Sequence, residues 1–270
     1  MCPRHPDRVS YVRCQRCGRP ACPECQRPAA VGIQCVDCVR EGRKSVPAPR
    51  TAYGARVRSG RPVVTLTLIG ICAVSWILQL VTDGSWTTRW AFAPFIAHDE
   101  PWRFLTTAFL HSTNPLHILF NMYALWIMGQ FLEPLLGRAR FLALFLLTAV
   151  AGSVGVLLLA GGPGSQAWNT AAIGASGAVF GLFGAAIPVL RQRGLQATQM
   201  VGLIVVNFAL GFFIANVAWQ AHLGGMIAGI ALGAVFAYAP RERRALIGWG
   251  ASAVLLVVLV VLAVVKYASV

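Results

Sequence analysis

The chain has 270 residues, of which 57% are hydrophobic and only 12% are charged. Soluble domains carry about a quarter charged residues, so this composition excludes an ordinary soluble enzyme and indicates a membrane protein. The formal net charge is +14, and residues 1–61 hold 13 of the 23 basic residues but only 4 of the 9 acidic ones. The sequence therefore predicts a basic N-terminal segment followed by a strongly apolar body.

The first 38 residues contain four short motifs in which two metal-binding side chains are separated by two residues. Together they supply eight thiol and imidazole ligands, enough for two structural, tetrahedral Zn²⁺ sites. Disulfides are the competing interpretation, disfavoured by the histidine among the ligands and by the cytosolic location expected for this segment. So short a segment has too little core to fold unaided, and bound metal would supply its folding free energy. The candidate ligands are Cys2, His5, Cys14, Cys17, Cys22, Cys25, Cys35 and Cys38.

This spacing resembles that of B-box-type zinc domains. The resemblance implies that the first and third motifs share one metal and that the second and fourth share the other. The last motif is Cys-x2-Cys where that family often has histidines, so pairing of consecutive motifs stays open. We expect a zinc-binding domain over residues 1–42 and a flexible basic linker over 43–61. The basic residues of the domain favour contact with anionic lipid or a cytosolic protein partner, and no nucleic-acid partner is expected.

Seven apolar runs follow the linker, and we expect each of them to cross a bilayer as a helix. The fourth run is short, which is acceptable for a helix that does not face lipid along its whole length. The runs cover residues 62–81, 115–133, 140–160, 176–190, 198–215, 221–239 and 246–265.

Basic residues in the short loops set the expected orientation of these runs. Arginines precede the first run and follow the second, fourth and sixth, whereas the loops over 161–170 and 216–220 carry no charge. The positive-inside rule therefore places the N-terminus in the cytoplasm and Val270 outside. The long loop over 82–114 then lies outside, and its aromatic residues favour a position in the membrane interface.

A single hydroxyl lies between glycines in "AAIGASGAVFGLFGAA", residues 171–186. Ser176 begins the fourth run, and His222 lies at the start of the sixth, in "AHLGGMIAGIALG", where glycines recur every four residues. Helix packing alone is one interpretation, because small residues let membrane helices approach closely. However, an ionisable residue inside a membrane is by default a functional hypothesis, and both helix starts are expected on the outer side. A serine and a histidine that meet there are suited to nucleophilic catalysis.

No acidic residue is placed to complete a catalytic triad, so the sequence favours a Ser–His dyad. Of the five acidic residues after position 61, Glu133 and Glu242 fall near the expected cytoplasmic side, far from Ser176. Gly174 leaves room for a substrate backbone, and a helix that begins at Ser176 offers unpaired N–H groups to an oxyanion.

A second polar pair lies in "HILFNMYAL" on the second run, where His117 and Asn121 are four residues apart and share one helix face. Such a pair can simply bond neighbouring helices to each other. Beside a serine and a histidine, their ring and amide N–H groups are also suitable donors to a tetrahedral oxyanion.

Four segments, "GASGAVFG", "AHLGGMIAG", "HILFNMYAL" and "PWRFLTTAFLH", together resemble the rhomboid family of intramembrane serine proteases over about residues 62–240. The resemblance implies an all-α polytopic membrane protein with a six-helix core over 62–240, and residues 241–270 fit a family variant with a seventh membrane helix.

The same resemblance implies a role for each site residue. Ser176 would be the nucleophile, His222 the base, and Asn121 and His117 the oxyanion donors, with Gly174 as the first glycine of the nucleophile motif. Trp102 and Arg103 would have structural roles, as would a polar helix contact at Glu133.

The resemblance further implies single-pass transmembrane substrates, cut near the outer face in a bacterial plasma membrane without a catalytic cofactor. We expect the fifth run, with Phe208, Phe212 and Phe213, and the loop containing Trp219 to form the lateral gate and cap. A catalytically silent rhomboid-like protein that binds membrane helices is the alternative. A transporter is disfavoured because the sequence lacks repeat symmetry and charges in both membrane halves.

Overall fold

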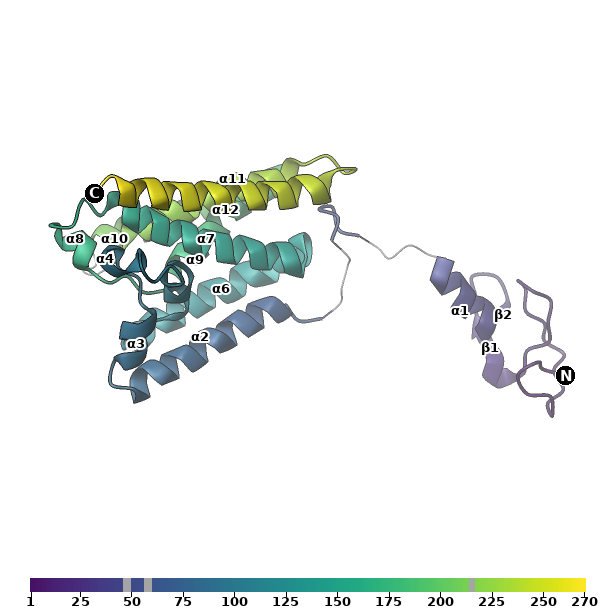
Figure 1. Cartoon of the computed structure of the whole chain (residues 1–270). Helices are drawn as coiled ribbons and strands as arrows, with labels where there is room; N and C mark the ends of the chain where they lie inside the picture. Colours follow the sequence, from purple (N-terminus) through teal and green to yellow (C-terminus); the bar gives the residue numbers. More distant parts are fainter. Residues whose placement is uncertain (46–49, 56–59, 214–216) are drawn as a thin grey trace. The chain divides into compact units, whose positions relative to one another are not determined.

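The computed structural model describes residues 1–45, 50–55, 60–213 and 217–270. The chain divides into two compact units, Met1–Pro49 and Arg50–Val270 (Figure 1). This division falls inside the segment for which the sequence predicts a linker, 43–61.

The N-terminal unit is small and has few regular elements. The strands β1 (Gln26–Pro28) and β2 (Ile33–Cys35) pair antiparallel, with Gln26 opposite Cys35. A 3-10 turn, η1 (Pro23–Cys25), precedes the hairpin, and helix α1 (Val36–Ser45) follows it. The buried hydrophobic cluster of the unit consists of cysteines and a single alanine: Cys2, Cys14, Ala21, Cys22, Cys25, Cys35 and Cys38.

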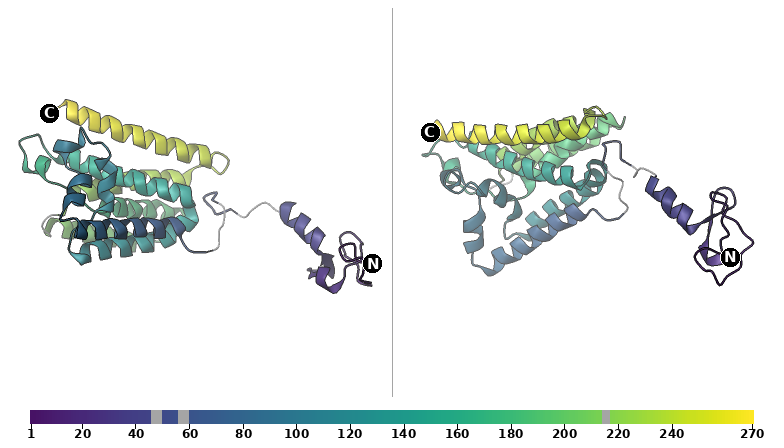
Figure 2. Two further views of the ribbon diagram at one scale, coloured as in Figure 1. Left: turned by 60° about the horizontal axis from the view of Figure 1, so that its bottom comes forward. Right: turned by 45° about the vertical axis from the view of Figure 1, so that its right-hand side comes forward.

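The second unit is a bundle of long helices (Figures 1 and 2). Within its described residues, each of the seven predicted apolar runs contains one helix of at least 16 residues. These helices are α2 (Val63–Val81), α6 (Pro115–Leu136), α7 (Arg138–Leu159), α9 (Ser176–Gln192), α10 (Thr198–Phe213), α11 (Trp219–Tyr238) and α12 (Arg244–Ala268).

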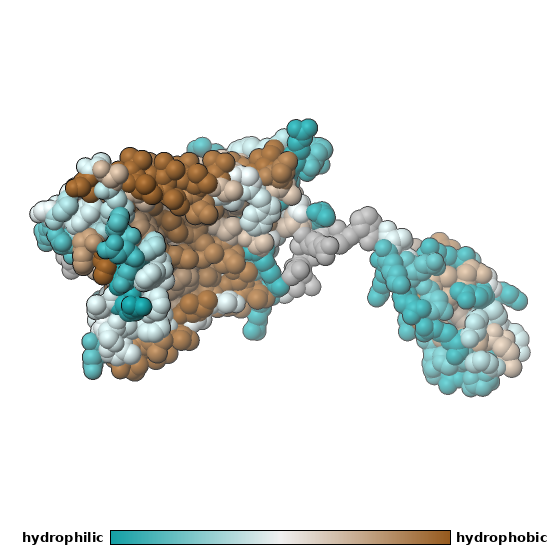
Figure 3. All heavy atoms as spheres, in the orientation of Figure 1, coloured by the Kyte–Doolittle hydropathy of each residue, from teal (hydrophilic) through white to brown (hydrophobic). Residues whose placement is uncertain are grey.

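Four of these helices, α2, α7, α11 and α12, are long and apolar enough to cross a membrane. Helix α9 has only 17 residues, and most of its residues are buried among its neighbours. That burial explains why a short helix is tolerated at the centre of the bundle. Apolar residues cover much of the visible side of this unit in Figure 3. The prediction of a multi-pass, all-α membrane protein is confirmed.

The loop between α2 and α6 contains short helices rather than extended chain. Arg103 is 4% exposed, donates to the carbonyls of Thr88 and Ala91, and pairs with Glu100 at 2.6 Å. One buried guanidinium thus ties together two parts of the loop, because buried backbone carbonyls need hydrogen-bond donors. The short elements are α3 (Ser85–Trp90), α4 (Pro94–Ala97), α5 (Arg103–Thr106) and η2 (Thr107–Phe109).

Glycines let α9 and α11 touch backbone to backbone, as the four-residue spacing predicts. A methyl group placed on Gly225 would overlap the carbonyl oxygen of Gly177, and one on Gly229 would overlap that of Gly181. Helix α7 approaches α11 in the same way, because a methyl group on Gly155 would lie 2.6 Å from the carbonyl oxygen of Gln220. The three helices α7, α9 and α11 therefore form a close-packed centre.

Part of the predicted flexible linker packs against the helix bundle. Tyr53 is fully buried, and its hydroxyl lies 3.3 Å from the carbonyl oxygen of Val189 and 3.0 Å from the Oε1 atom of Gln192. Thr51 donates to the carbonyl of Leu135 at 2.8 Å. For residues 51–55 the expectation of a flexible linker is therefore wrong, because a buried tyrosine and these bonds hold them in place; residues 46–49 and 56–59 lie outside the described residues.

The backbone contact of α9 with α11 predicts a selective sensitivity to one added methyl group. Gly229→Ala should lower the stability of the purified protein by about 1–3 kcal/mol, because the helices must separate to relieve the overlap. Gly250→Ala on α12 is the control, since nothing lies within 4 Å of that position, and alanine favours a helix by up to about 1 kcal/mol. Thermal unfolding in detergent would measure the stability of both variants. Equal unfolding midpoints for the two variants would contradict the backbone contact between α9 and α11.

Candidate active site

Ser176 and His222 meet at the start of two adjacent helices. Ser176 is the first residue of α9, His222 lies in the first turn of α11, and the distance from serine Oγ to histidine Nε2 is 2.9 Å. The close contact between these helices sets that distance, because Gly177 and Gly225 lie directly beside the two residues. Ser176 remains partly exposed, whereas His222 is 6% exposed.

Phe180 fixes the orientation of the His222 ring. The two rings are stacked, with centroids 4.2 Å apart and planes 6° from parallel. Phe180 is four residues after Ser176, so the serine and the phenylalanine lie on the same face of α9. The imidazole therefore rests on one helix face with its Nε2 atom directed at the hydroxyl. Nothing in the sequence marked Phe180 except that spacing.

The second ring nitrogen of His222, Nδ1, is buried and has no hydrogen-bond partner among the described residues. In a triad, a carboxylate would bind this atom. Here Glu133 instead bonds to α2, and Glu100 pairs with Arg103. The arrangement among the described residues is therefore a serine–histidine pair.

His117 faces the serine from the first turn of α6. The backbone N–H of Ser112 donates to its Nδ1 at 3.0 Å, so the neutral ring carries its proton on Nε2. That Nε2 atom would lie 3.2 Å from a methyl group built on Gly174, and the same methyl would be 3.7 Å from Ser176 Oγ. The ring N–H and the hydroxyl therefore border one small space beside Gly174.

The strand-like segment before Ser176 is held by the loop that contains Arg103. Gly174 N–H donates to the carbonyl of Thr107 at 3.1 Å, and the Thr107 hydroxyl donates to the carbonyl of Ala172. Ala172 also forms an isolated bridge with Phe92. No sequence pattern pointed to Thr107, because its role depends on contacts across more than 60 residues.

Asn121 lies one turn after His117 on α6 and is 8% exposed. Its amide nitrogen donates to the carbonyl of His117 at 2.8 Å. An amide has two hydrogens, so the second remains for another acceptor. His111, which follows η2 in the same loop, is fully buried with its ring centroid 5.4 Å from that of His117.

Comparison with known proteins shows the family of this chain. The model of the Rhomboid domain matches residues 98–239. The chain belongs to the rhomboid family. It is 32% identical over 191 residues to the rhomboid protease GluP of Bacillus subtilis, covering 67% of this chain but 36% of that protein. It is 31% identical over 198 residues to the rhomboid protease GlpG of Yersinia pestis and of Yersinia pseudotuberculosis, covering 69% of this chain and 67% of each relative.

Helix α10 lies along one side of the Ser176–His222 pair. The Phe208 ring lies 6.4 Å from that of Phe180 and 6.3 Å from that of Trp219, measured between centroids. A methyl group on Gly211 would lie 3.7 Å from His222 Nδ1, so α10 passes directly beside the histidine. The side chains of Phe212 and Phe213, also expected in a gate, lie outside the described residues.

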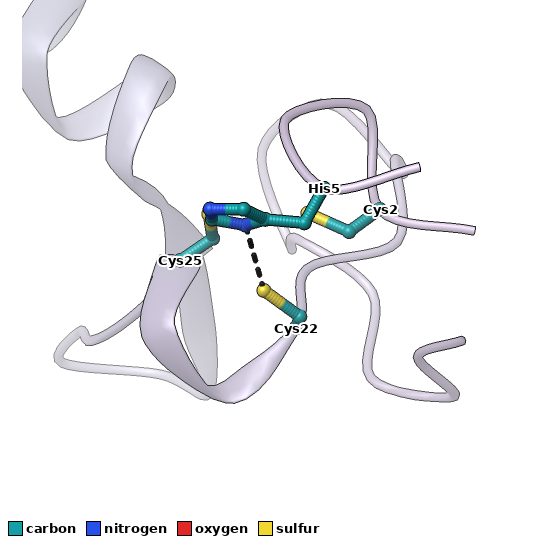
Figure 4. Close-up of side chains that lie close together, drawn as sticks. All are labelled: Cys2, His5, Cys22 and Cys25. Carbon is teal, nitrogen blue, oxygen red and sulfur yellow. Dashed lines mark hydrogen bonds between the residues drawn. The ribbon is translucent and has the colours of Figure 1, made fainter. Parts of the chain in front are cut away.

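The cysteine motifs outside the rhomboid domain come together in two clusters, each with its ligand atoms within 4.8 Å of one another. The first and third motifs form one cluster, Cys2, His5, Cys22 and Cys25 (Figure 4). The second and fourth form the other, Cys14, Cys17, Cys35 and Cys38. This is the arrangement that the B-box resemblance implies, and all eight cysteines of the chain are free thiols.

The first cluster has the donor geometry of a metal centre. His5 Nδ1 lies 3.2 Å from Cys22 Sγ and 3.4 Å from Cys25 Sγ, while Nε2 faces the Glu24 carboxylate at 3.8 Å. Metal-binding histidines commonly direct their second nitrogen at such a carboxylate. Three sulfurs and one nitrogen, like four sulfurs in the second cluster, suit a tetrahedral ion such as Zn²⁺.

Thiol ionisation in this cluster is uneven. A hydrogen bond from the Cys22 backbone lowers the pKa of Cys2 to about 6. Burial, followed by the sulfurs of Cys2 and Cys22, raises the pKa of Cys25 to about 11. Closely spaced thiolates repel one another, and a bound cation removes that repulsion.

The position of Gly174 yields a testable expectation for the rhomboid site. Gly174 has φ +130, a conformation that side chains rarely adopt, and an added methyl would press on the His117 ring. Gly174→Ala should slow the reaction of Ser176 with a fluorophosphonate probe by about 10²–10³-fold, the loss expected when an oxyanion donor is displaced. Gly162→Ala is the matched control, since nothing lies within 4 Å of it. Equal labelling of the two variants would exclude a role for this close contact.

Proposed function

We propose that this rhomboid-family chain is an intramembrane serine protease that cuts single-pass membrane proteins near the outer face. The observation that carries the proposal is the 2.9 Å contact between Ser176 Oγ and His222 Nε2. A serine and a histidine at the ends of apolar helices have no need to meet for packing alone, since glycines already provide the close approach. The names of the relatives, which are rhomboid proteases, support the same assignment.

The chemistry follows from that contact. Ser176 Oγ attacks the carbonyl carbon of the substrate as its proton moves to His222 Nε2. The tetrahedral intermediate collapses when the C–N bond breaks and the same Nε2 proton passes to the leaving amine. Water then attacks the acyl-serine ester, gives a proton to Nε2, and the proton returns to Ser176 as the carboxylic acid leaves.

Charge in the transition state falls on the carbonyl oxygen, beside Gly174. The Nε2–H of His117 is directed at this space, and the second amide hydrogen of Asn121 is a further candidate donor. One donor of this kind contributes roughly 3 kcal/mol of transition-state stabilisation. Because no described residue places a carboxylate at His222 Nδ1, stacking on Phe180 takes over the orienting role that an aspartate has in a triad.

A transmembrane substrate must unwind before its peptide bond can reach Ser176, because helical carbonyls are already hydrogen-bonded. Helix-weakening residues such as glycine and proline near the cut would favour cleavage for this reason. Helix α10 is the proposed entry gate, because it lies beside His222 and many of its described side chains are exposed, such as Val201, Leu203 and Val205. The arginines in alternate loops support a cytoplasmic N-terminus in a bacterial plasma membrane, with the site on the outer side.

The N-terminal unit is proposed to hold two structural Zn²⁺ ions. Each cluster supplies four ligands and leaves no open position for a reactive water, so the metal would stabilise the fold rather than act on substrate. Its basic surface would suit a cytosolic protein partner or anionic lipid.

Substitution of the two paired residues tests the protease proposal. Ser176→Ala and His222→Ala should each reduce cleavage of a membrane-anchored model substrate by at least about 10⁴-fold, since the two residues act as a unit. Ser252→Ala on α12 and His98→Ala in the outer loop are the matched controls and should retain activity. Continued cleavage by Ser176→Ala would refute the proposal. Unchanged binding without any cleavage by the wild type would favour the catalytically silent alternative.

Metal analysis tests the zinc assignment separately. The purified full chain should contain about two zinc ions, and His5→Ala should reduce this to about one, because one ligand set is then incomplete. Cys72→Ser replaces a buried cysteine on α2 that belongs to neither cluster, and it should leave the content unchanged. Model-substrate cleavage in detergent should be equal in all three proteins. Zinc content that is unaffected by His5→Ala would contradict the cluster assignment.

A further inference from the structure

A cavity of about 340 Å³ lies where α6 ends and α7 begins, at the far end of the bundle from Ser176. Its lining includes the guanidinium-bearing residues Arg61, Arg138 and Arg140, together with Glu133 and Trp249. The volume falls within the range of small-molecule sites in proteins. The catalytic proposal does not use this cavity.

Among the described residues that line the cavity, Glu133 is the single acidic one, and its carboxylate already accepts hydrogen bonds. Glu133 is 4% exposed and accepts hydrogen bonds from Val64 N at 3.0 Å, Thr65 N at 2.9 Å and Thr65 Oγ1 at 2.7 Å. These donors belong to the first turn of α2, where backbone N–H groups lack helical partners. Arg138 is only loosely paired with Glu133, at 3.9 Å. Three arginines against one satisfied carboxylate leave the cavity positively charged.

The arginines are also accessible to a ligand. Arg61 is exposed, and the Arg138 side chain retains 42% of its accessible surface. Arg140 is partly held, because it donates to the carbonyl of Tyr53. Guanidinium groups bind phosphate oxygens through paired, charge-assisted hydrogen bonds. The cavity thus presents donors that match a phosphate group.

The position of the cavity indicates which class of molecule carries the phosphate. It lies at the ends of apolar helices, and Trp249, which is 47% exposed, lines it from α12. Tryptophan on such helices is typical of the level of lipid headgroups. The backbone around Gly137, between α6 and α7, forms another part of the lining. A phosphate at this level belongs to a phospholipid whose acyl chains lie along the apolar helices.

We propose that this cavity binds the headgroup phosphate of an anionic phospholipid. Arg61 and Arg138 contact the phosphate, and Trp249 packs beside the glycerol region. The lipid would lie against the turn at Gly54 and Ala55, which also lines the cavity, and would thereby bridge α6, α7, α12 and this turn.

Lipid binding to the full chain in detergent provides the test, by native mass spectrometry with added phosphatidylglycerol. Arg61→Gln/Arg138→Gln should bind phosphatidylglycerol at least about tenfold more weakly than the wild type, as expected for loss of two cations near a lipid phosphate. The control variant Arg191→Gln/Arg241→Gln also removes two positive charges. Both positions are exposed at the same end of the bundle but lie outside the cavity. That control should change affinity less than twofold.

Arg61→Glu is a second variant that leaves Glu133 and Arg138 unchanged, and it should weaken binding at least as much. Thermal unfolding in the same detergent identifies any variant that is misfolded. Equal losses in the cavity and control pairs, or no loss in either, would overturn the proposal. If phosphatidylcholine binds with the same affinity as phosphatidylglycerol, the site does not select an anionic lipid. If inorganic phosphate displaces phosphatidylglycerol at a concentration similar to that of the lipid, the site binds free phosphate instead.

Discussion

The backbone contact between α9 and α11 is the constraint on which the rest of the structure depends. Glycine carbonyls of α9 occupy the space where side chains of α11 would otherwise lie. This contact brings the first turns of both helices together and sets the 2.9 Å distance between Ser176 and His222. A larger residue at Gly225 would move the base away from the hydroxyl even though neither reacting group had changed. Packing and chemistry are therefore set by the same glycines.

Much of the membrane unit could be predicted from the sequence, because bilayer spans need long apolar runs. The meeting of Ser176 with His222 was also predictable, since matched glycine spacing and loop charges place both at one end. The stacking of Phe180 and the bond from Thr107 to Ala172 were not, because they depend on rotamers and on contacts between distant segments. The burial of Tyr53 was not predictable either, because one aromatic residue in a polar, glycine-containing segment gives no periodic signal.

The N-terminal unit is stabilised differently from the helix bundle. Its buried residues are almost all cysteines, so burial of apolar surface contributes little to its stability. Spacing alone identified the ligands, but it left two pairings open. The antiparallel contact of β1 with β2, with Gln26 opposite Cys35, brings the third and fourth motifs side by side. The first and second motifs then complete different clusters, and each metal would join segments that are distant in sequence.

The burial of Tyr53 has a mechanical consequence. Its hydroxyl lies within hydrogen-bonding distance of Val189 and Gln192 in the last turns of α9, the helix whose first residue is Ser176. A helix of 17 residues is about 25 Å long. Tyr53 and the reacting hydroxyl thus lie at opposite ends of one helix, with Pro188 near the end that Tyr53 contacts. A force on the chain before Arg50 would therefore reach α9 through Tyr53 and its two contacts, at the end of the helix opposite Ser176.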